Sequence, residues 1–269
     1  MRELNGRIAF ITGAASGIGL GIAQACADAG MRLMLADIDA GALDRVRTAF
    51  AADGHHVDTQ ILDVADPAGW RAAADRLRES GGRLHLLCNN AGITGSGLRI
   101  DELDRREWQR IIDTNLGGLF LGVQAMLPLL KAHGEGGHVV NTASMAALLP
   151  YAGGASYAAS KAAMLAFSET LKLELVSSGI GVSVLLPAQV RTQLFATSAR
   201  QLGPGETSAM AERRDAARLS LEREGLDPRR VGEQVLEAVR RQRFYIFTHP
   251  QLRDTVARRF DAMLAAMGG

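Results

Sequence analysis

Cysteine is scarce in this sequence, and so are long uninterrupted apolar runs. The two cysteines, Cys26 and Cys88, lie far apart and form no CxxC motif, which excludes a disulfide framework and favours a reducing, cytoplasmic compartment. The histidines show no HxxxH spacing, so we expect no metal site. The longest apolar stretch, residues 116–130, is interrupted by glycine, glutamine and proline, which predicts a buried helix and not a membrane span.

Charge of one sign is also lacking. The 30 basic and 29 acidic residues give a net charge of +1 and are interspersed along the chain, so we expect neither nucleic acid nor a membrane as a partner. The first residues contain no hydrophobic signal core, which also favours the cytoplasm. A length of 269 residues with 47% apolar content predicts one globular domain over 1–269.

Short apolar runs alternate with helical patterns along the chain. We expect strands at 8–11, 32–36, 57–62, 84–88, 138–143, 180–186 and 244–247, and helices at 20–29, 40–52, 67–80, 107–131, 155–178, 227–241 and 251–267. This alternation predicts an α/β fold with a doubly wound parallel sheet and helices on both faces. Residues 188–226 are polar, look irregular and include Gly203-Pro204-Gly205, which favours a substrate-binding loop or lid.

A glycine-rich turn follows the first expected strand. Gly13, Gly17 and Gly19 form a G-x-x-x-G-x-G spacing between strand 8–11 and the next helix. Glycines let a backbone approach a pyrophosphate closely, and the free N–H groups at a helix start favour its negative charge. The turn alone is a weak signal, but its strand-turn-helix position predicts a dinucleotide site.

Two acidic residues end the next two expected strands. A carboxylate at Asp37 could accept hydrogen bonds from the adenosine ribose and would repel a 2′-phosphate, which favours NAD over NADP. The alternative is an N-cap of the following helix, for which Asp39 is at least as good a candidate. Asp63 could accept from the adenine amino group beside the Val64 N–H, or it could be a turn residue.

Polar and glycine residues also interrupt later elements. The fourth expected strand ends in Asn89-Asn90-Ala91-Gly92, where Asn89 could tie neighbouring strand ends together and Gly92 could leave room for a cofactor. Asn115 is unfavourable inside the expected helix 107–131. It could hold a water against Lys161, or it could simply bend the helix.

Tyr157 and Lys161 lie one helical turn apart, so their side chains share a face of helix 155–178. A phenol has a pKa of about 10, and one ammonium at about 4 Å is worth about 4 kcal/mol at an effective dielectric of about 20. We therefore expect Lys161 to lower the pKa of Tyr157. Ser144, at the end of strand 138–143, could reach the same cleft and bond a substrate oxygen. The alternative is an exposed i, i+4 pair and a capping serine.

With these motifs, the chain resembles the classical short-chain dehydrogenase/reductases over residues 5 to about 192. The resemblance implies a Rossmann-like single domain, NAD as cofactor and a small-molecule alcohol or ketone as substrate. It implies that Tyr157 is the general acid/base, that Lys161 binds the nicotinamide ribose and lowers the phenol pKa, that Ser144 orients the substrate oxygen and that Asn115 positions a proton-relay water. Besides Tyr157 and Lys161, the implied cofactor contacts are Gly13, Ser16, Gly17, Ile18, Gly19, Asp37, Asp63, Val64, Asn89, Ala91, Gly92, Pro187, Val190 and Thr192.

The chain departs from the family pattern at two positions. Ala188 stands where the family usually has a glycine that permits positive φ, and Ala143 replaces a frequent serine. The C-terminal run 245–250 is similar to a subgroup acting on bulky, often aromatic secondary alcohols, including lignin-derived ones.

The sequence therefore predicts an oxidoreductase that transfers a hydride between NAD(H) and a secondary alcohol or ketone. The alternatives are an NADP-dependent, ketoacyl-type ketone reductase and a non-catalytic nucleotide-binding regulator. Arg191 and Gln193 are candidates for polar substrate contacts. The apolar segments 116–130 and 155–178 could pair with a second subunit, so we expect a homo-oligomer, a dimer or a tetramer. Apolar side chains that could line the substrate pocket, or could equally be core residues, are Met145, Leu148, Leu149, Tyr151 and Phe195.

Overall fold

The structure, a computed structural model, describes residues 1, 3–202 and 207–268. In this part of the chain seven strands form one sheet: β1 (Ile8–Thr12), β2 (Arg32–Asp37), β3 (Val57–Ile61), β4 (Leu86–Asn89), β5 (Gly137–Thr142), β6 (Ile180–Leu186) and β7 (Tyr245–Phe247). Every expected strand is present, and no strand end differs from its expected position by more than two residues. The central strands form because each is a short β-branched or leucine-rich run that is buried on both sides, whereas the edge strands β3 and β7 are partly exposed.

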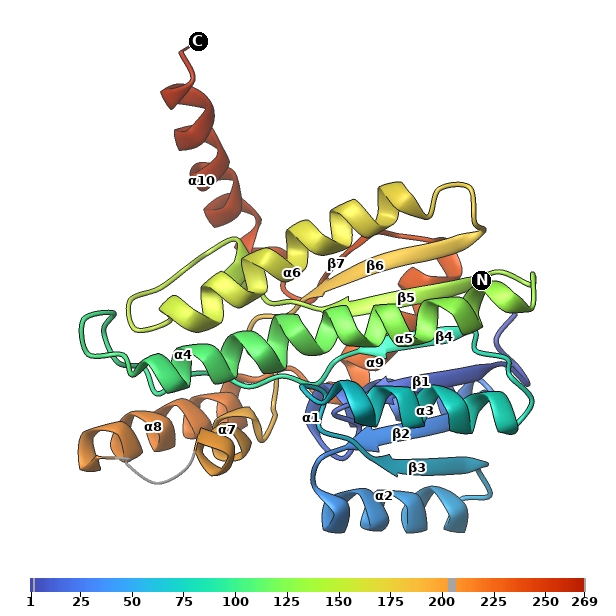
Figure 1. Cartoon of the computed structure of the whole chain (residues 1–269). Coiled ribbons are helices and arrows are strands. Elements are labelled where there is room, and N and C mark those ends of the chain that lie inside the picture. The colour runs from blue at the N-terminus through green and yellow to red at the C-terminus, as the bar shows by residue number, and fades with distance from the viewer. Residues whose placement is uncertain (2, 203–206, 269) are drawn as a thin grey trace.

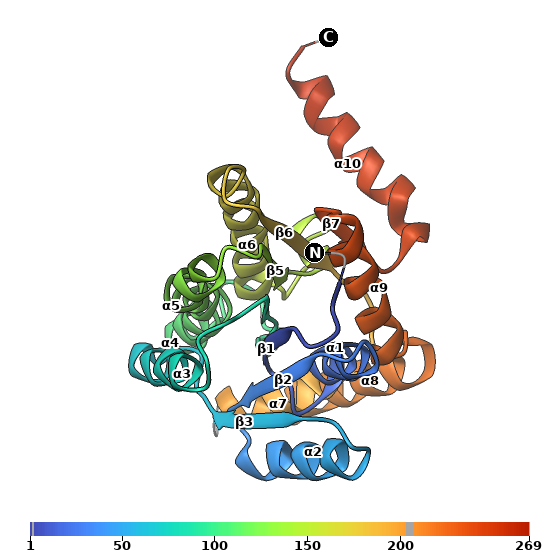
Figure 2. The same ribbon diagram turned by 90° about the vertical axis from the view of Figure 1, so that its right-hand side faces the viewer.

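The strands are ordered β3-β2-β1-β4-β5-β6-β7, and every neighbouring pair is parallel (Figures 1 and 2). The direction of chain progress reverses between β1 and β4. In open α/β sheets, ligands bind outside the carboxyl ends of the strands at such a switch point. The doubly wound Rossmann-like fold is confirmed, and it places the expected motifs at one edge.

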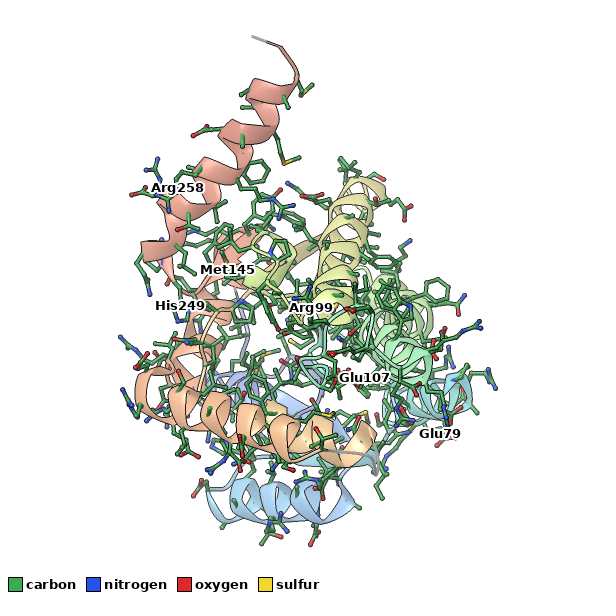
Figure 3. All side chains as sticks on the ribbon, turned by 90° about the vertical axis from the view of Figure 1, so that its left-hand side faces the viewer. Glu79, Arg99, Glu107, Met145, His249 and Arg258 are labelled. Carbon is green, nitrogen blue, oxygen red and sulfur yellow. The ribbon has the colours of Figure 1, made fainter. Side chains whose placement is uncertain are left out.

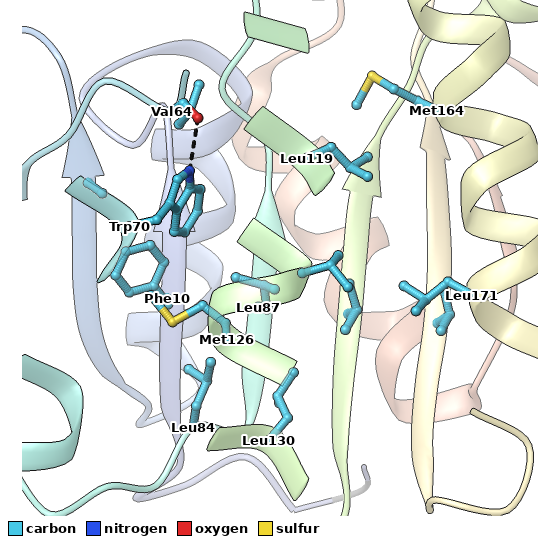
Figure 4. Packing of buried hydrophobic residues seen from close by; sticks show 14 of the residues in the cluster. Phe10, Val64, Trp70, Leu84, Leu87, Leu119, Met126, Leu130, Met164 and Leu171 are labelled. Carbon is cyan, nitrogen blue, oxygen red and sulfur yellow. Dashed lines mark hydrogen bonds between the residues drawn. The ribbon is translucent and has the colours of Figure 1, made fainter. Parts of the chain in front are cut away.

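Three helices cover one face of the sheet: α3 (Pro67–Glu79), α5 (Gly118–Ala132) and α6 (Ala155–Glu174). Their apolar sides pack on Phe10 and other side chains of the strands (Figure 4). Trp70 is 1% exposed and donates its indole N–H to the Val64 carbonyl at 2.9 Å. That bond satisfies the polar end of a buried indole and fixes α3 below the loop that follows β3.

The other face is covered by α1 (Gly17–Asp28), α2 (Ala40–Ala52) and α9 (Pro228–Arg241). Helices α1 and α9 approach each other very closely at two glycines. A Cβ on Gly21 would lie 2.1 Å from the Pro228 oxygen, and a Cβ on Gly232 would lie 2.1 Å from the Gly21 oxygen. Only glycine at both positions permits this contact, which anchors the glycine-rich turn to the C-terminal half.

The expected single helix 107–131 is interrupted. Helix α4 (Arg105–Ile112) continues through a π-helical turn, Asp113–Gly117, into α5. A π turn inserts one extra residue per turn, and here it contains the unfavourable Asn115. By length and composition the helical stretch 105–132 could cross a membrane, with 44% of its apolar window buried inside the protein. Packing of α5 in the core accounts for that composition.

The expectation that 188–226 is irregular is wrong for most of its length. The segment contains α7 (Leu194–Leu202) and α8 (Ser208–Glu224), the latter capped by Thr207, whose side chain accepts from the Met210 N–H. Helix α8 is polar and has little apolar periodicity, and α7 is only nine residues long, so the sequence pattern did not reveal them. The Gly203-Pro204-Gly205 run lies outside the described residues.

The chain ends in a helix that leaves the body of the protein. After β7, a 3-10 turn (Pro250–Leu252) leads into α10 (Arg253–Ala266), which projects beyond β6 and β7 (Figures 1 and 2). All residues of α10 are described, and none is buried.

Candidate active site

A cleft of about 880 Å³ runs along the carboxyl edge of the sheet. Loops that follow β1, β2, β3, β4, β5 and β6 form its walls, together with α7 and α8. Its lining includes the implied site residues Gly13, Ser16, Gly17, Ile18, Asp37, Asp63, Val64, Ala91, Gly92, Ser144, Tyr157, Lys161, Pro187, Val190 and Thr192. The fold therefore brings residues from every one of the sequence motifs to this one cleft.

The glycine-rich turn is shaped by contacts that only glycine allows. Gly13 and Gly17 have φ values of +63° and +53°, a region that side chains with a Cβ rarely adopt. Gly19 does not line the cleft. A Cβ at this position would lie 2.1 Å from the Gly13 oxygen, so only glycine fits there. Its role is to let α1 start directly beneath the turn.

The amino terminus of α1 faces this cleft with its backbone donors available. Ser16 occupies the N-cap position but makes no side-chain cap hydrogen bond, and the first turn carries no acidic residue. Uncapped N–H groups and the helix dipole favour an anion. The residues present therefore fit the pyrophosphate of a dinucleotide.

Asp37 is oriented by two backbone donors. Its Oδ2 accepts from the Ala15 N–H and its Oδ1 from the Asp39 N–H, both at 3.0 Å. The N-cap of α2 is Asp39, which accepts from the Ala42 N–H at 2.9 Å. The capping alternative for Asp37 is therefore wrong, and its carboxylate stands on the cleft wall.

Asp63 and Val64 lie on the wall one strand further along. Asp63 Oδ1 accepts from the Ala65 N–H at 3.0 Å, which is an Asx turn. The turn alternative is thus correct for one oxygen, and the side chain still borders the cleft.

Thr12 and Asn90 are joined by hydrogen bonds that the sequence analysis did not predict. Thr12 Oγ1 accepts from the N–H groups of Asn90 and Ala91, each at 3.0 Å, and Asn90 Nδ2 donates to the Thr12 carbonyl. These bonds hold the end of β1 against the end of β4. The available signal was a polar residue at the end of β1 and another directly after β4.

Asn89 is buried behind the wall and does not border the main cleft. Its Nδ2 donates to Asn141 Oδ1 at 3.0 Å, and Asn141 Nδ2 donates to Ser168 Oγ at 3.0 Å. The expectation that Asn89 ties strand ends together is confirmed. In the structure its side chain supports β4, β5 and α6 from within.

Tyr157 and Ser144 meet on the substrate side of the cleft. Ser144 caps a short 3-10 turn (Met145–Ala147), so its backbone is extended and its hydroxyl is held close to the end of β5. The Ser144 hydroxyl lies near the Tyr157 phenol and acts to lower the phenol pKa. Burial of the phenol is the larger effect and raises the pKa of Tyr157 to about 12.

Lys161 is 3% exposed and faces the same cleft, so the alternative of an exposed pair is wrong. Its Nζ donates to the Thr142 carbonyl at 2.9 Å and lies 5.6 Å from the centroid of the Tyr157 ring. Burial lowers the pKa of Lys161 to about 7. The expectation that Lys161 lowers the Tyr157 pKa is therefore not met by the protein's own groups, because desolvation of the phenol is the larger effect.

Asn115 lies behind the cleft wall, in the π turn. Its Oδ1 accepts from the Ile93 N–H at 2.8 Å, and its Nδ2 donates to the Ile93 carbonyl and to Ser160 Oγ. A Cβ on Gly92 would lie 3.0 Å from this Oδ1 and 3.4 Å from Lys161 Nζ. Asn115 thus ties the loop after β4 to α6 beside Lys161, and its role in a proton relay stays a prediction.

The loop after β6 forms the part of the cleft wall next to Ser144, whose hydroxyl donates to the Pro187 carbonyl at 3.4 Å. Pro187, Ala188, Val190 and Thr192 all border the cleft. Among the described non-glycine residues only Gln242 has a positive φ, so Ala188 has an ordinary backbone conformation and fits where the family usually has glycine.

The substrate side is mostly apolar. Of the expected pocket residues, Met145, Leu149, Tyr151 and Phe195 border the cleft and Leu148 does not. Gln193 also lines it. Arg191 does not line it, because its guanidinium turns away to pair with Asp227 at 2.5 Å; the expectation of a substrate contact there is wrong.

Thr114 was not foreseen as a site residue. Its Oγ1 is buried, borders the cleft and has no hydrogen-bond partner among the described residues. A buried hydroxyl in this state is available for a ligand. Nothing in the sequence distinguished it from the other residues of the long helix.

One group of potential metal ligands exists among the described residues, and it lies at the opposite edge of the sheet. His85, His133 and Glu135 come within 4.8 Å of one another. Both ring nitrogens of His133 and one of His85 already bond backbone groups. Glu135 pairs with Arg7 and Arg83, which would repel a cation.

Comparisons with known proteins agree with this geometry. The family model for short chain dehydrogenase matches residues 7–203. A 1-deoxy-11-beta-hydroxypentalenate dehydrogenase of Streptomyces exfoliatus is 35% identical, over 96% of this chain and 89% of that protein. A C alpha-dehydrogenase of Sphingobium sp. (strain NBRC 103272 / SYK-6) is 30% identical, over 98% and 87%.

A solved structure is similar over nearly the whole length. It is a short chain dehydrogenase/reductase of Burkholderia phymatum in complex with NAD, 34% identical, with a TM-score of 0.92 over 98% of this chain and 97% of that one. Fold, family model and relatives agree. The chain therefore belongs to the classical short-chain dehydrogenase/reductase family of nucleotide-binding oxidoreductases.

Proposed function

We propose that this protein is an NAD-dependent oxidoreductase that interconverts a neutral, apolar secondary alcohol and its ketone. One observation carries the proposal. Ser144, Tyr157 and Lys161 border the same cleft as the glycine-rich turn and Asp37, so a proton donor and a dinucleotide site share one space.

In this mechanism the chain's own residues move a proton and fix the substrate. In alcohol oxidation, the Tyr157 oxygen takes the proton of the substrate hydroxyl, and in reduction it returns a proton to the ketone oxygen. Ser144, which borders the cleft beside the same phenol, orients the substrate oxygen. Bound NAD would supply the hydride acceptor, and Lys161 would hold its ribose beside the phenol.

The cofactor preference rests on Asp37. Structural neighbours include complexes with NAD and with NADPH, so family membership alone does not decide between them. A carboxylate held on the wall by two backbone donors has free lone pairs for ribose hydroxyls and opposes a 2′-phosphate. This supports NAD over an NADP-dependent, ketoacyl-type reductase.

The lining of the cleft supports a neutral substrate. Its described cations are Lys161 at the catalytic group, Arg45 of α2, and Arg200, which approaches Asp39 at 3.7 Å near the ribose end. The substrate side presents Met145 and Leu149 and no cation to bind a carboxylate or phosphate. The resemblance of the C-terminal run 245–250 to enzymes of bulky, often aromatic secondary alcohols makes such an alcohol one class to test.

We also propose that the segment 188–226 acts as a lid. Phe195 of α7 and Leu221 of α8 border the cleft, so movement of these helices would open the substrate side. Two buried free cysteines, Cys26 and Cys88, support a reducing, cytoplasmic location.

The function can be tested directly. A panel of secondary alcohols and ketones, incubated with NAD(H) and with NADP(H), would be read by nicotinamide absorbance. We expect turnover of neutral, bulky members with NAD(H) and little with matched carboxylates. Tight NADH binding without turnover of any member would instead favour the non-catalytic nucleotide-binding regulator.

We propose that the protein is a homo-oligomer. Leu173 of α6 is 73% exposed, Val176 after it is 78% exposed, and Phe120 of α5 is 48% exposed. Apolar side chains of this size on covering helices favour burial by a second copy. We expect light scattering at micromolar concentration to give a dimer or tetramer mass, and Leu173→Glu to lower it. Leu219→Glu, on α8, is the control, and a monomer mass for the unaltered protein would refute the proposal.

A further inference from the structure

The C-terminal helix is mostly solvent-exposed, yet the 3-10 turn that leads into it borders the cleft through Leu252. Figure 3 shows α10, with Arg258 on it, rising above the segments that carry Met145 and His249. No residue of α10 is buried, so the helix contributes little to the core. Its contacts with the rest of the chain are concentrated at its beginning, beside the substrate side of the cleft.

Arg259 makes the first of these contacts. Its Nη1 donates to the Leu148 carbonyl at 2.5 Å. Leu148 ends the 3-10 turn that Ser144 begins, and the next residue, Leu149, borders the cleft. A charged donor makes a stronger hydrogen bond than a neutral one. Arg259 therefore holds the segment Ser144–Tyr151, here called the substrate loop, from outside.

His249 and Leu252 make the second and third contacts. Burial lowers the pKa of His249, while the Gln189 backbone lies close enough to the His249 ring to act in the opposite direction to a smaller extent. The Nδ1 of His249 lies 2.6 Å from Thr248 Oγ1. Gln189 belongs to the loop after β6, two residues beyond Pro187, and borders the cleft. Leu252 itself forms part of the cleft wall. One short C-terminal segment thus touches both loops that enclose the substrate side.

We propose that the segment Thr248–Arg259 is a specificity-determining brace that sets the position of the substrate loop. This inference rests on the proposed function, since it concerns which alcohols fit the cleft. The brace acts through Leu148 and Gln189, so Arg259 is a positioning residue. Small displacements of groups that position a substrate have large effects on rate.

The effect should depend on substrate size. Met145, Leu149 and Tyr151 of the substrate loop border the end of the cleft that receives the organic substrate. The glycine-rich turn follows β1 and Asp37 ends β2, so both belong to other strand ends than this loop, which follows β5. A loosened loop therefore costs affinity for a bulky alcohol that needs the whole wall, and leaves dinucleotide binding unchanged.

The chain offers a matched control for this experiment. Arg258 precedes Arg259 and is exposed. Within the described part of the chain its side chain donates only to Thr255, on the same helix. Alanine at either position preserves helix propensity. We would compare Arg259→Ala, Arg258→Ala and Arg259→Lys with the unaltered protein, using one bulky and one small secondary alcohol, with NADH affinity and thermal stability measured in parallel.

We expect Arg259→Ala to raise KM for the bulky alcohol about 10-fold, in line with loss of a charged hydrogen bond, and to raise KM for the small one less than about 3-fold. Arg258→Ala should change neither, and Arg259→Lys should recover part of the loss. The proposal would be wrong if the two alanine variants had the same KM for the bulky alcohol. It would also be wrong if Arg259→Ala lost as much affinity for NADH as for the bulky alcohol.

A second readout does not require turnover. Hydrogen–deuterium exchange of the amides in residues 145–151, with NADH present, should be faster in Arg259→Ala than in Arg258→Ala. Equal exchange in both would also overturn the brace. If no alcohol is turned over by the unaltered protein, the proposed function fails, and the exchange comparison alone decides whether Arg259 holds the loop.

Discussion

Replacing Tyr157 by phenylalanine should abolish turnover while leaving NADH affinity nearly unchanged. The ring keeps its packing, so the cleft keeps its shape. The phenol oxygen is the one proton-transferring atom that the mechanism places against the substrate oxygen, and general acid–base groups of this kind contribute roughly 10²- to 10⁴-fold. Steady-state kinetics in both directions, with NADH binding followed by fluorescence, would measure the two effects separately.

Tyr151→Phe is the matched control for Tyr157→Phe. Tyr151 also borders the cleft, and its hydroxyl bonds the Thr94 side chain. We expect Tyr151→Phe to keep turnover within about 10-fold of normal, because one neutral hydrogen bond is worth roughly 0.5–1.5 kcal/mol. Near-normal turnover in Tyr157→Phe, or equal losses in the two variants, would refute the assignment of Tyr157.

The pH dependence follows from the same two side chains. Burial raises the pKa of Tyr157 to about 12, so the phenol is protonated at neutral pH and ready to donate to a ketone. Alcohol oxidation needs the phenolate, and we expect its kcat/KM to rise as pH increases from 7 to 10. Ketone reduction should fall over the same range. The pKa that such a pH profile yields is that of the interacting Tyr157–Lys161 pair and not of one side chain alone.

Local spacing predicted that Tyr157 and Lys161 would lie together in the cleft, because one helical turn fixes which side chains share a face. Tyr157 and Lys161 are four residues apart on α6, and Ser144 follows β5 directly. The parallel sheet then brings strand ends to one edge. These placements need only local geometry and the fold, so the sequence sufficed.

The electrostatics of the site could not be predicted in this way. The pKa of Tyr157 depends on how much protein surrounds the phenol, and that protein includes the substrate loop and helices far along the chain. Spacing showed that Lys161 is near, but it did not show that Nζ would bond the Thr142 carbonyl. Desolvation therefore exceeded the expected benefit of the ammonium.

Contacts between distant segments were also missed. Arg259 and Leu148 are 111 residues apart in the chain, and no periodicity links them. Helices α7 and α8 were read as irregular because their polar residues face solvent on several sides. In contrast, the glycine motif marked Gly19 as a position of close backbone approach, and the structure shows that approach at the Gly13 oxygen.

Replacing Asp37 by asparagine should reduce the preference for NADH over NADPH by roughly 10- to 100-fold. Asparagine can keep one acceptor for the Ala15 or Asp39 N–H, so the loop after β2 should persist. The substitution removes the negative charge that opposes a 2′-phosphate, which itself carries about −1.5 to −2. Arg45 and Arg200 border the same end of the cleft and would then attract it. Dissociation constants for both reduced cofactors, measured by fluorescence, give the ratio.

The control for this change is Asp63→Asn. Asp63 borders the adenine end of the cleft and bonds the Ala65 N–H, an Asx turn that asparagine also supports. Asp63 follows β3, whereas the carboxylate that faces the ribose hydroxyls in this proposal follows β2. Loss of the Asp63 charge should therefore change the affinities for NADH and NADPH by the same factor or leave both unchanged. If Asp37→Asn leaves the ratio of the two dissociation constants unchanged, or Asp63→Asn shifts that ratio as far, then the charge at Asp37 does not select NAD, and the NADP-dependent reductase becomes the better assignment.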